Sequence, residues 1–300
     1  MGVKKLLYGI LKKMKFLPPE TYIPIYYEYY LGKKLDLNNP VEFNQKIQWL
    51  KTYYHPDILT QLVDKYSVRE YVKEKIGAQY LNELIAVYDK ASKVNFDELP
   101  HQFVIKGVHG FHFNLIVKDK STLNRKRARF LMNKWMSKNQ YFRGGFEWAY
   151  KNVPPRLIAE KFLTEMDKDV ILDYKFFCFN GEPKFLQIDV ERGINDQRAF
   201  YDLEWNKLEF YNKENKVYEG EMTQPENFEE MVWAARTLAD KFPFVRVDLY
   251  SIKNKTIFGE MTFYPSDGRK DFHPSKYNKI LGDYIQLPHL AEGQKEIKEI

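Results

Sequence analysis

The stretch that decides the fold reads Phe244-Val-Arg-Val-Asp-Leu-Tyr-Ser-Ile-Lys-Asn-Lys-Thr-Ile-Phe-Gly-Glu-Met-Thr-Phe-Tyr264. Apolar and polar residues alternate on both sides of Lys253-Asn254-Lys255, which predicts a hairpin of two strands. Side chains alternate between the two faces of a strand. A turn centred on Asn254 therefore places four polar side chains on one face in two opposed pairs, Asp248 with Glu260 and Arg246 with Thr262.

The other face of this hairpin is apolar and is expected to lie in the core. It carries Val245, Val247, Leu249, Met261 and Phe263. The same register predicts that two aromatic pairs, Phe244 with Tyr264 and Tyr250 with Phe258, bracket the polar face.

Two carboxylates directly opposite each other on paired strands lie roughly 5 Å apart and repel each other. A cation between Asp248 and Glu260 would remove that repulsion. Oxygen ligands on rigid strands suit Mg²⁺, especially when nucleotide phosphates complete its coordination. The alternative is an exposed strand face with solvated charges, and a slip of one residue in the register would undo the arrangement.

The composition allows one large domain or two modest ones with a sizeable core, since 44% of the 300 residues are hydrophobic and 16% aromatic. The net charge of +6 favours anionic partners without choosing among nucleotide, acidic glycan, nucleic acid and lipid. The single cysteine, Cys178, excludes an intramolecular disulfide and a Cys/His metal cluster. Its apolar surroundings predict a small buried side chain.

Residues 1–20 form a basic amphipathic segment. A helix over 4–17 places apolar and basic side chains on separate faces: Leu7, Ile10, Leu11, Met14 and Leu17 against Lys4, Lys5, Lys12, Lys13 and Lys15. Such a helix can lie on an anionic membrane surface or dock on its own protein, and the sequence leaves both open. No apolar run approaches the roughly 20 residues that span a bilayer, and the N-terminus is not a convincing signal peptide. We expect a cytoplasmic protein, with a peripheral contact at the inner face of the membrane as an open alternative.

The chain divides into a mainly helical region over 21–100 and a largely antiparallel part over 101–290, which predicts an α+β class. Residues 291–300 form a charged tail that we expect to be frayed. The helical region includes a helix opened by Pro40 and another that begins near Asp64. The strands expected after residue 100 cover 103–106, 114–117, 156–160, 173–179 and 184–189, with helices at 122–140 and 227–240.

Two strand ends carry polar residues suited to a nucleotide. Lys106 precedes Gly107-Val-His109-Gly110, where a lysine and backbone N–H groups can reach a phosphate. Glu160-Lys161-Phe-Leu163 ends an apolar strand and could bond a nucleobase or ribose. An ordinary solvated lysine and an ordinary strand terminus are the alternatives.

Lys175 alternates with apolar neighbours on the same strand as Asp173, so it needs a partner or a ligand if it is buried. Arg192 and Arg198 flank a polar loop and could hold a carboxylate or phosphate bidentately, or be ordinary loop charges. The chain contains no G-x-S-x-G, H-E-x-x-H, G-x-x-x-x-G-K-[ST] or G-x-G-x-x-G motif. Serine-hydrolase, zinc-protease, P-loop and dinucleotide-binding functions therefore lose support.

The order of these motifs resembles the ATP-grasp enzymes and, more narrowly, the TupA-like ATP-grasp family of bacterial surface-polysaccharide gene clusters. The resemblance covers roughly residues 25–288. The motifs that carry the general resemblance are Lys65, Lys106, Glu160-Lys161-Phe-Leu163, Arg246-x-Asp248 and Glu260-x-Thr262. The stretches that carry the narrower one are 39–51, 64–69, 103–106, 173–181, 242–250 and 258–264.

The resemblance implies an ATP-grasp fold in which two α+β subdomains clasp ATP, with a lid subdomain over 101–160 and a C-terminal subdomain over 161–290. It implies ATP contacts by Lys65, Lys106, His109, Gly110, Glu160, Lys161 and Leu163. It implies a Mg²⁺ site at Asp248, Glu260 and Thr262, where many ATP-grasp enzymes have Asn at the last position. We further assign Arg246, Lys175 and Arg192 to catalysis, and Arg198 and Asp173 to substrate binding.

The activity implied by the resemblance is ATP-dependent ligation of a carboxylate to an amine through an acyl phosphate. The implied substrates are uronic-acid residues of a surface glycan and an amino acid or related amine, and no nucleic-acid partner is expected. A sugar kinase, a glycosyltransferase and a non-catalytic glycan- or membrane-binding module are the alternatives. The loop after Lys106 departs from the family, since it reads His109-Gly110-Phe111-His112 where His-Gly-Ser-Gly is usual.

Overall fold

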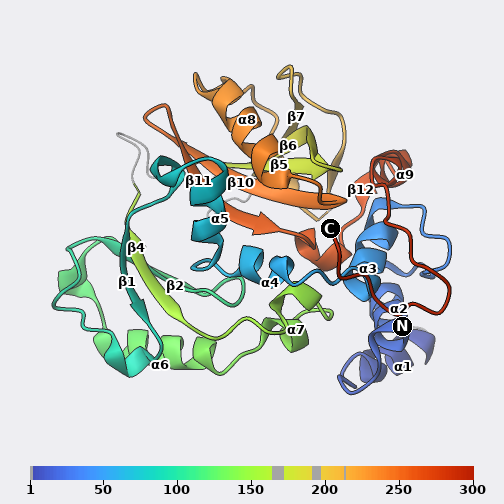
Figure 1. Ribbon diagram of the computed structural model, residues 1–300, viewed down its shortest axis with the longest axis horizontal. Helices are drawn as coiled ribbons and strands as arrows, with labels where there is room; N and C mark the ends of the chain where they lie inside the picture. Colours follow the sequence, from blue (N-terminus) through green and yellow to red (C-terminus); the bar gives the residue numbers. More distant parts are fainter. Residues whose placement is uncertain (1–2, 164–171, 191–196, 213) are drawn as a thin grey trace.

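The hairpin over 244–264 forms one edge of the largest sheet in the computed structural model, which describes residues 3–163, 172–190, 197–212 and 214–300. Within these residues the large sheet has the strand order β11-β10-β5-β6-β7-β9 (Figure 1). Neighbouring strands are antiparallel except β7 and β9, which are parallel. The strands are β5 (Asp173–Phe179), β6 (Glu182–Val190), β7 (Gln197–Asp202), β9 (Lys216–Val217), β10 (Phe244–Ile252) and β11 (Lys255–Thr262).

The register of the hairpin confirms that Asp248 faces Glu260 and Arg246 faces Thr262. The predicted turn was wrong, however. The loop has two residues, Lys253 and Asn254, both with positive φ, and Ile252 pairs with Lys255. This turn type suits the right-handed twist of the strands.

A two-residue turn alone would place Gly259, and not Glu260, opposite Asp248. A β-bulge at Gly259 shifts the register and produces the observed carboxylate pair. The register shifts by one residue between Asp248 and Leu249, so that Leu249 pairs with Phe258 while Asp248 pairs with Glu260. The expected pair of Tyr250 with Phe258 is therefore wrong, because Tyr250 pairs with Ile257. The ladder ends at Arg246 and Thr262, and Phe244 pairs instead with β5.

A second sheet, which we call the lid sheet, consists of four antiparallel strands as far as the structure is described, in the order β1-β4-β2-β3. These are β1 (Leu84–Tyr88), β2 (Phe103–Gly107), β3 (Asn114–Val117) and β4 (Leu157–Lys161). Helix α6 (Arg125–Met136) covers it through Ala128, Met132 and Trp135. The range 21–100, predicted to be mainly helical, thus also supplies the edge strand of the lid sheet.

Three helices of the N-terminal region belong to the core under the large sheet, whereas α2 (Pro19–Leu31) lies in a separate hydrophobic cluster with Tyr141 and Phe146. α3 (Phe43–Tyr53), α4 (Ile58–Val63) and α5 (Val68–Lys75) share one hydrophobic cluster with β5, β10 and β11. α8 (Phe228–Ala239) packs on β5, β6 and β10. The other elements are α1 (Val3–Leu11), α2 (Pro19–Leu31), α7 (Gln140–Arg143), α9 (Lys276–Asp283) and the strand pair β8 (Tyr211–Asn212) and β12 (Phe272–His273).

The ends of two helices and the C-terminal tail differ from expectation. α1 ends at Leu11, short of the helix predicted over 4–17. α3 begins at Phe43 with a capping box between Glu42 and Gln45, so Pro40 lies before the helix. The charged tail is docked rather than frayed, because Ile297 exchanges backbone hydrogen bonds of 2.7 Å with Tyr53 and His55.

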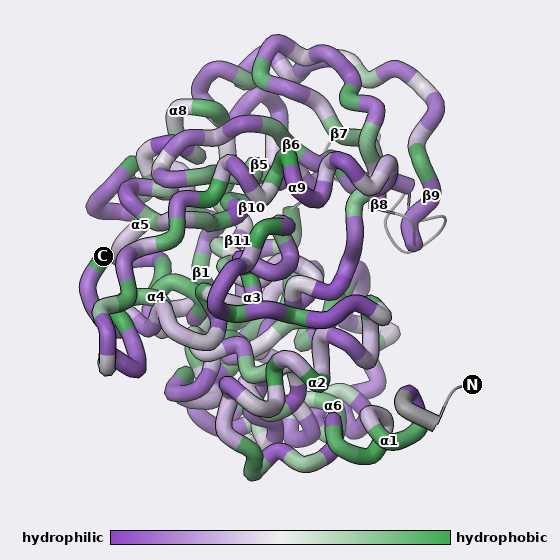
Figure 2. Tube along the Cα trace, turned by 90° about the vertical axis from the view of Figure 1, so that its right-hand side faces the viewer, coloured by the Kyte–Doolittle hydropathy of each residue, from purple (hydrophilic) through white to green (hydrophobic). Residues whose placement is uncertain are grey.

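None of the helices in the described part of the chain has the length and apolarity needed to cross a membrane. In Figure 2 the hydrophobic residues of α1 lie at one end of the molecule, away from the large sheet.

Replacing Gly259 by alanine is expected to destabilise the hairpin. A Cβ at this position would lie 2.9 Å from the backbone oxygen of Asp248 and 3.1 Å from the Tyr250 ring. Overpacking of this kind costs about 1–3 kcal/mol of unfolding free energy, measurable by urea denaturation. Gly9→Ala is the control, since its Cβ would be at an ordinary contact distance of 3.5 Å from Tyr29. Equal stability of the Gly259 variant and wild type would contradict the role given to the bulge.

Candidate active site

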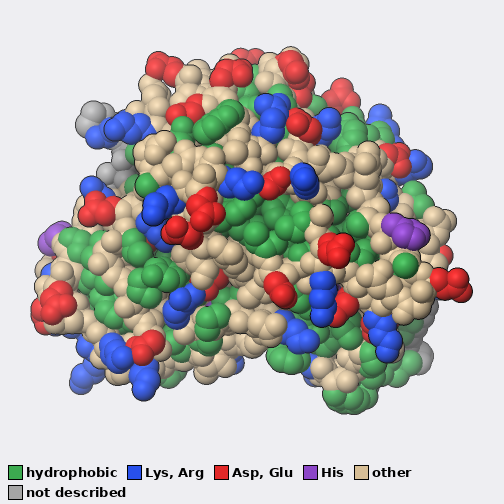
Figure 3. All heavy atoms as spheres, viewed as in Figure 1, with side chains coloured by type: hydrophobic (Ala, Val, Ile, Leu, Met, Phe, Trp, Pro, Cys, Tyr) green, Lys and Arg blue, Asp and Glu red, His purple; other side chains and the backbone are tan. Residues whose placement is uncertain are grey.

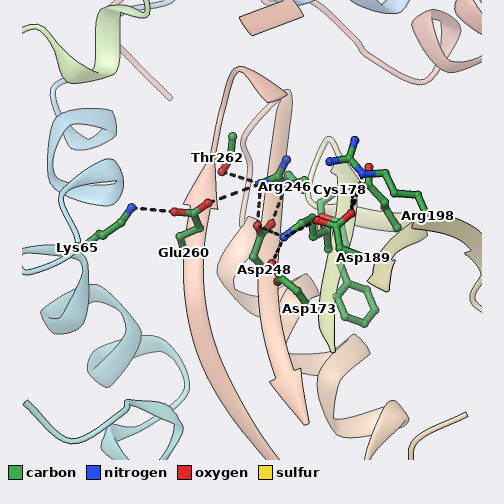
Figure 4. A network of polar contacts seen from close by, with 12 residues as sticks. Lys65, Asp173, Cys178, Asp189, Arg198, Arg246, Asp248, Glu260 and Thr262 are labelled. Atoms are coloured by element: carbon green, nitrogen blue, oxygen red, sulfur yellow. Dashed lines mark hydrogen bonds and ion pairs between the residues drawn. The ribbon is translucent and has the colours of Figure 1, made fainter. Parts of the chain in front are cut away.

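Arg246 and Asp248 form the centre of a polar row on the large sheet (Figure 4). The guanidinium donates from Nε to Asp248 Oδ1 at 2.6 Å and from Nη2 to Oδ2 at 2.7 Å. Its Nη2 also donates to Thr262 Oγ1 at 3.2 Å. Two parallel charge-assisted bonds fix both the position and the orientation of Asp248.

Glu260 lies on the other side of this guanidinium. Its Oε1 is 3.7 Å from Arg246 Nη2, and its Oε2 accepts a 2.8 Å hydrogen bond from Lys65 Nζ. Burial alone would raise the pKa of Glu260, but Lys65 and Arg246 outweigh it and hold that pKa below its usual range. The cation that the sequence analysis expected between Asp248 and Glu260 is therefore, in this structure, a guanidinium.

Lys175 extends the row onto β5, directly opposite Asp248 in the register. Its buried ammonium contacts Asp173 and lies 3.1 Å from Asp248 Oδ2 and 3.6 Å from Asp189 Oδ2. Burial lowers the pKa of Lys175, but Asp173 and Asp248 raise it more, so the side chain is held in its charged form. The sequence predicted that this lysine needs a partner, and the structure supplies three.

Asp189 on β6 is a site residue that the sequence analysis did not single out. It faces Arg198 in the register of β6 and β7, and Arg198 Nε lies 2.7 Å from its Oδ1. Despite burial, Lys175 and Arg198 hold the pKa of Asp189 below its usual value. Arg192, which was assigned to catalysis, lies outside the described residues.

A cavity of about 610 Å³ opens over this row. One wall comes from the large sheet and includes Lys175, Asp189, Arg198, Arg246, Glu260 and Thr262. Further lining residues are Phe111 and His112 of the loop between β2 and β3, Glu147 after α7, and Asp267 and Arg269 of the turn that follows β11. The cavity therefore lies between the large sheet and these three segments.

The turn between α4 and α5 holds Lys65 against Glu260. The buried Asp64 accepts backbone hydrogen bonds from Tyr66 at 2.8 Å and Ser67 at 3.1 Å. It also accepts a 2.5 Å bond from Arg156, which precedes β4 of the lid sheet. Asp64 thus fixes Lys65 locally and joins this turn to the lid.

Lys106 and Glu160 form a second group, in the lid sheet. Lys106 Nζ is 2.7 Å from Glu160 Oε2, and Arg69 Nη1 is 3.3 Å from Oε1. Two residues that the resemblance assigned to the phosphates and to the adenine hinge are thus ion-paired with each other. Arg69 is an addition that sequence reasoning missed, although it lies in one of the stretches that carry the resemblance.

His109 and Gly110 lie in the interior of the lid. His109 donates to the backbone oxygen of Trp135 at 2.9 Å, and burial lowers its pKa. A Cβ at Gly110 would lie 2.8 Å from the Phe113 ring. These contacts give both residues a packing role, and the cavity is lined instead by the next two residues, Phe111 and His112.

Lys161 and Leu163, assigned to the adenine hinge, do not line the main cavity. The Lys161 ammonium pairs with Glu83 at 3.2 Å on the surface. Its backbone N–H donates to the Glu83 carbonyl at 3.0 Å, and its carbonyl accepts from Asn82 at 2.9 Å.

Glu147 is a buried acid in the cavity wall that the sequence analysis missed. Its Oε2 accepts a 2.9 Å bond from Gln140. Burial, together with the nearby Asp267, raises the pKa of Glu147 to about 8. Asp267 itself is held by the buried Lys51 of α3, with Nζ 2.7 Å from Oδ1.

The turn that carries Asp267 is clamped to α3. Ser266, Asp267 and Gly268 all have left-handed backbone conformations, which are costly for the first two. Gln48 of α3 donates to the carbonyls of Asp267 at 2.9 Å and of Gly268 at 3.0 Å. These bonds hold the turn, and with it the cavity wall, in place.

Among the described residues, no group of three or more His, Cys, Asp and Glu side chains is arranged to hold a metal. Asp248, Glu260 and Thr262 supply two carboxylates and a hydroxyl on one strand face, a donor set of hard oxygens that suits Mg²⁺ when phosphates add further ligands. Glu260 is about one-third exposed and lines the cavity, so it is accessible to an incoming ion.

Several known proteins resemble this chain. The family model described as TupA-like ATPgrasp matches residues 45–286. A search of curated proteins found no match.

Three solved structures are similar at low identity. D-alanine–D-alanine ligase from Bacillus anthracis complexed with ATP is 16% identical over 69% of this chain and 55% of its own, with a TM-score of 0.40. N5-carboxyaminoimidazole synthase from Aspergillus clavatus is 11% identical over 68% of this chain and 44% of its own, with a TM-score of 0.38. Phosphoribosylamine–glycine ligase from Thermotoga maritima is 11% identical over 70% of this chain and 50% of its own, with a TM-score of 0.43. The chain thus spans about half the length of these three proteins.

The family model covers most of the chain, and its range includes both sheets and the whole polar row from Lys65 to Thr262. The chain therefore belongs to the TupA-like ATP-grasp family.

Proposed function

We propose that the protein is an ATP- and Mg²⁺-dependent ligase that joins a carboxylate to an amine. The observation that carries the proposal is the polar row beneath the cavity, where Arg246 links two opposed carboxylates and Lys175 and Lys65 flank them. Phosphoryl chemistry needs this combination of cations for phosphate and hard oxygen ligands for a metal.

The charges in this row are balanced before any ligand enters. Four cations, Lys65, Lys175, Arg198 and Arg246, face four carboxylates, Asp173, Asp189, Asp248 and Glu260. Phosphates would give the cations new partners, and Mg²⁺ would do the same for Asp248 and Glu260. Binding can therefore exchange ion pairs without leaving a buried charge uncompensated. An uncompensated charge in a low dielectric would destabilise the site strongly.

In the first step of the proposed reaction, a substrate carboxylate oxygen attacks the γ-phosphorus of ATP. The bond to the β-phosphate oxygen breaks, and an acyl phosphate and ADP form. Lys65, Lys175 and Arg246 would neutralise the charge that develops on the transferred group. Mg²⁺ held by Asp248, Glu260 and Thr262 would supply further charge neutralisation when bound.

In the second step, the amine attacks the acyl carbon, phosphate leaves, and the amine loses a proton. Glu147 is the proposed acceptor of that proton. It lies in the wall of the same cavity, and its pKa of about 8 is close to the working pH, where a general base is most effective.

The substrate classes and the nucleotide contacts proposed next come from the family resemblance, and the remaining assignments come from the sequence pattern. We propose a uronic-acid glycan as the carboxylate substrate and an amino acid or related amine as the second substrate, with Arg198, Asp173 and Arg192 in substrate binding and catalysis. Nucleotide contacts are proposed for Lys65, Lys106, His109, Gly110, Glu160, Lys161 and Leu163. We also propose a cytoplasmic location with a peripheral membrane contact through 4–17, and no nucleic-acid partner.

A second candidate is a non-catalytic ATP-grasp module. It is favoured by the bulky Phe111 and His112 in the cavity wall. Arg143 holds Phe111 there, donating to its carbonyl at 3.0 Å with the guanidinium 5.0 Å from the ring.

The deciding experiment incubates the protein with ATP, Mg²⁺, a panel of uronic-acid glycans and a panel of amines. Mass spectrometry of an amide together with ADP and phosphate would support the ligase. A phosphorylated sugar would indicate a kinase, and transfer of a sugar from a nucleotide-sugar a glycosyltransferase. Absence of Mg²⁺-dependent ATP binding in calorimetry would leave the non-catalytic module.

Asp248→Asn and Glu260→Gln are each expected to lower turnover by about 10²–10³-fold, because each removes a negative charge that the proposed metal ion requires. Circular dichroism checks that each variant is folded. Glu182→Gln, which neutralises a carboxylate at the exposed end of the same sheet, is the matched control and should be fully active. Wild-type turnover in either folded site variant would refute the assignment.

Glu147→Gln is expected to change the pH dependence of stability. The pKa of Glu147 rises from 4.5 to about 8 on folding, so the native state binds more protons than the unfolded state between these values. This contribution to stability is complete below about pH 4.5 and is lost as the pH rises through 8, by on the order of 5 kcal/mol. The variant should lack that loss in denaturation curves measured from pH 5 to 8.5.

Glu147→Gln also tests whether Glu147 accepts the proton in the second step or only packs in the cavity wall. Amide formation should fall by about 10²–10⁴-fold while ATP binding is unchanged. Normal amide formation would show that Glu147 is a buried structural acid.

A further inference from the structure

Basic side chains are distributed unevenly along this chain. Residues 1–19 contain five lysines, residues 120–146 contain eight Lys or Arg, and neither segment contains an Asp or Glu. Of the 47 basic and 41 acidic side chains in the chain, the rest of the sequence therefore holds 34 basic and 41 acidic ones. The positive net charge resides entirely in these two segments.

The two segments meet in space. α1 and α6 both lie along the lower end of the molecule in Figure 1 and again in the view turned by 90° in Figure 2. Lys15, which follows α1, donates to the backbone oxygen of Gly144, just after α7, at 2.9 Å. We call the surface formed by residues 5–17 and 120–146 the basic face.

On the basic face, α1 turns its apolar side chains outward. It docks on α2 through its other side, where Tyr8 donates to Glu28 at 3.2 Å and Gly9 lies against Tyr29. Leu6 is 63% exposed and Ile10 is 58% exposed, and beyond the helix Phe16 is 77% exposed. The helix therefore docks on its own protein, which is one of the two alternatives left open by the sequence, and it still presents apolar residues to solvent.

α6 also has one side packed in the core and one side that presents an apolar residue to solvent. Its inner side chains belong to the lid core, and Phe130 on the outer side is 68% exposed. The exposed basic residues at helical spacing around Phe130 are Lys126, Arg127, Lys134 and Lys138, and none of them pairs with a described carboxylate. Phe142 of α7, which follows α6 in the chain, is 49% exposed. Figure 3 shows Lys and Arg side chains gathered at the lower left, over α6.

We infer that the basic face docks on an anionic lipid bilayer, with α1 and the lid helices α6 and α7 on the same surface. Exposed Leu, Ile and Phe beside Lys and Arg are what an interfacial segment uses, with the apolar groups entering the boundary of the acyl chains and the cations attracting anionic headgroups. A soluble polyanion would need the cations but not the apolar side chains. The inference does not depend on the ligase activity.

The basic face is larger than the contact expected for residues 4–17 alone, because it also includes α6 and α7. Arg143 of α7 also holds Phe111 in the cavity wall. Membrane docking would thus involve a helix that contacts the cavity wall through Arg143.

The test is flotation of the full-length protein with vesicles of phosphatidylglycerol and phosphatidylcholine, or of phosphatidylcholine alone, at about 0.15 M salt. Wild type should bind the anionic vesicles and not the neutral ones. The variant Lys126→Glu/Arg127→Glu/Lys134→Glu should bind roughly a hundredfold more weakly, since each cation near an anionic surface contributes about fivefold. Phe130→Ser and Leu6→Ser/Ile10→Ser should each weaken binding by about tenfold or more.

The control carries the same charge change elsewhere, as Lys255→Glu/Lys276→Glu/Lys295→Glu, and should bind within a few fold of wild type. Circular dichroism checks the fold of every variant. The proposal is overturned if wild type does not bind anionic vesicles, or if the control loses as much as the α6 variant. It is also overturned if the α6 variant binds like wild type, or if the apolar variants do, which would indicate a soluble polyanion as the partner.

Discussion

The contact of Arg246 with two opposed carboxylates is the constraint on which the candidate site depends. Its bidentate bond fixes Asp248, and the same guanidinium lies 3.7 Å from Glu260. Without a cation there, two carboxylates paired across strands would repel each other. The bulge at Gly259 makes the contact possible, because it brings Glu260 opposite Asp248 despite the two-residue turn.

The neighbouring strands extend this contact into a charge-balanced row. Lys175 lies opposite Asp248 on β5, and Arg198 lies opposite Asp189 on β7. In a low dielectric each of these groups would be costly to bury alone, whereas together they neutralise one another. The result is a polar surface under the cavity in which the buried charges are paired.

The sequence revealed the parts of this site that depend on local pattern. Strand alternation placed Arg246, Asp248, Glu260 and Thr262 on one face, and the alternation around Lys175 indicated a buried charge in need of partners. The error in the turn was harmless, since the unforeseen bulge compensated for it. The resemblance assigns His109 to the nucleotide, and the structure adds a contact of its ring with Trp135 that a motif does not reveal.

The residues that the sequence did not reveal are those whose roles depend on contacts between distant segments. Glu147 becomes a perturbed acid only because Asp267 lies near it, and Asp267 is in place only because Lys51 and Gln48 of α3 clamp its turn. These residues come from three parts of the chain more than 90 positions apart, and no local pattern links them. The same reasoning explains β1, a short strand whose place in the lid sheet depends on pairing with β4 about 70 residues later. The part of the site that contains Asp248 and Glu260 thus follows from one hairpin, whereas the position of Asp267 in the cavity wall depends on contacts with α3.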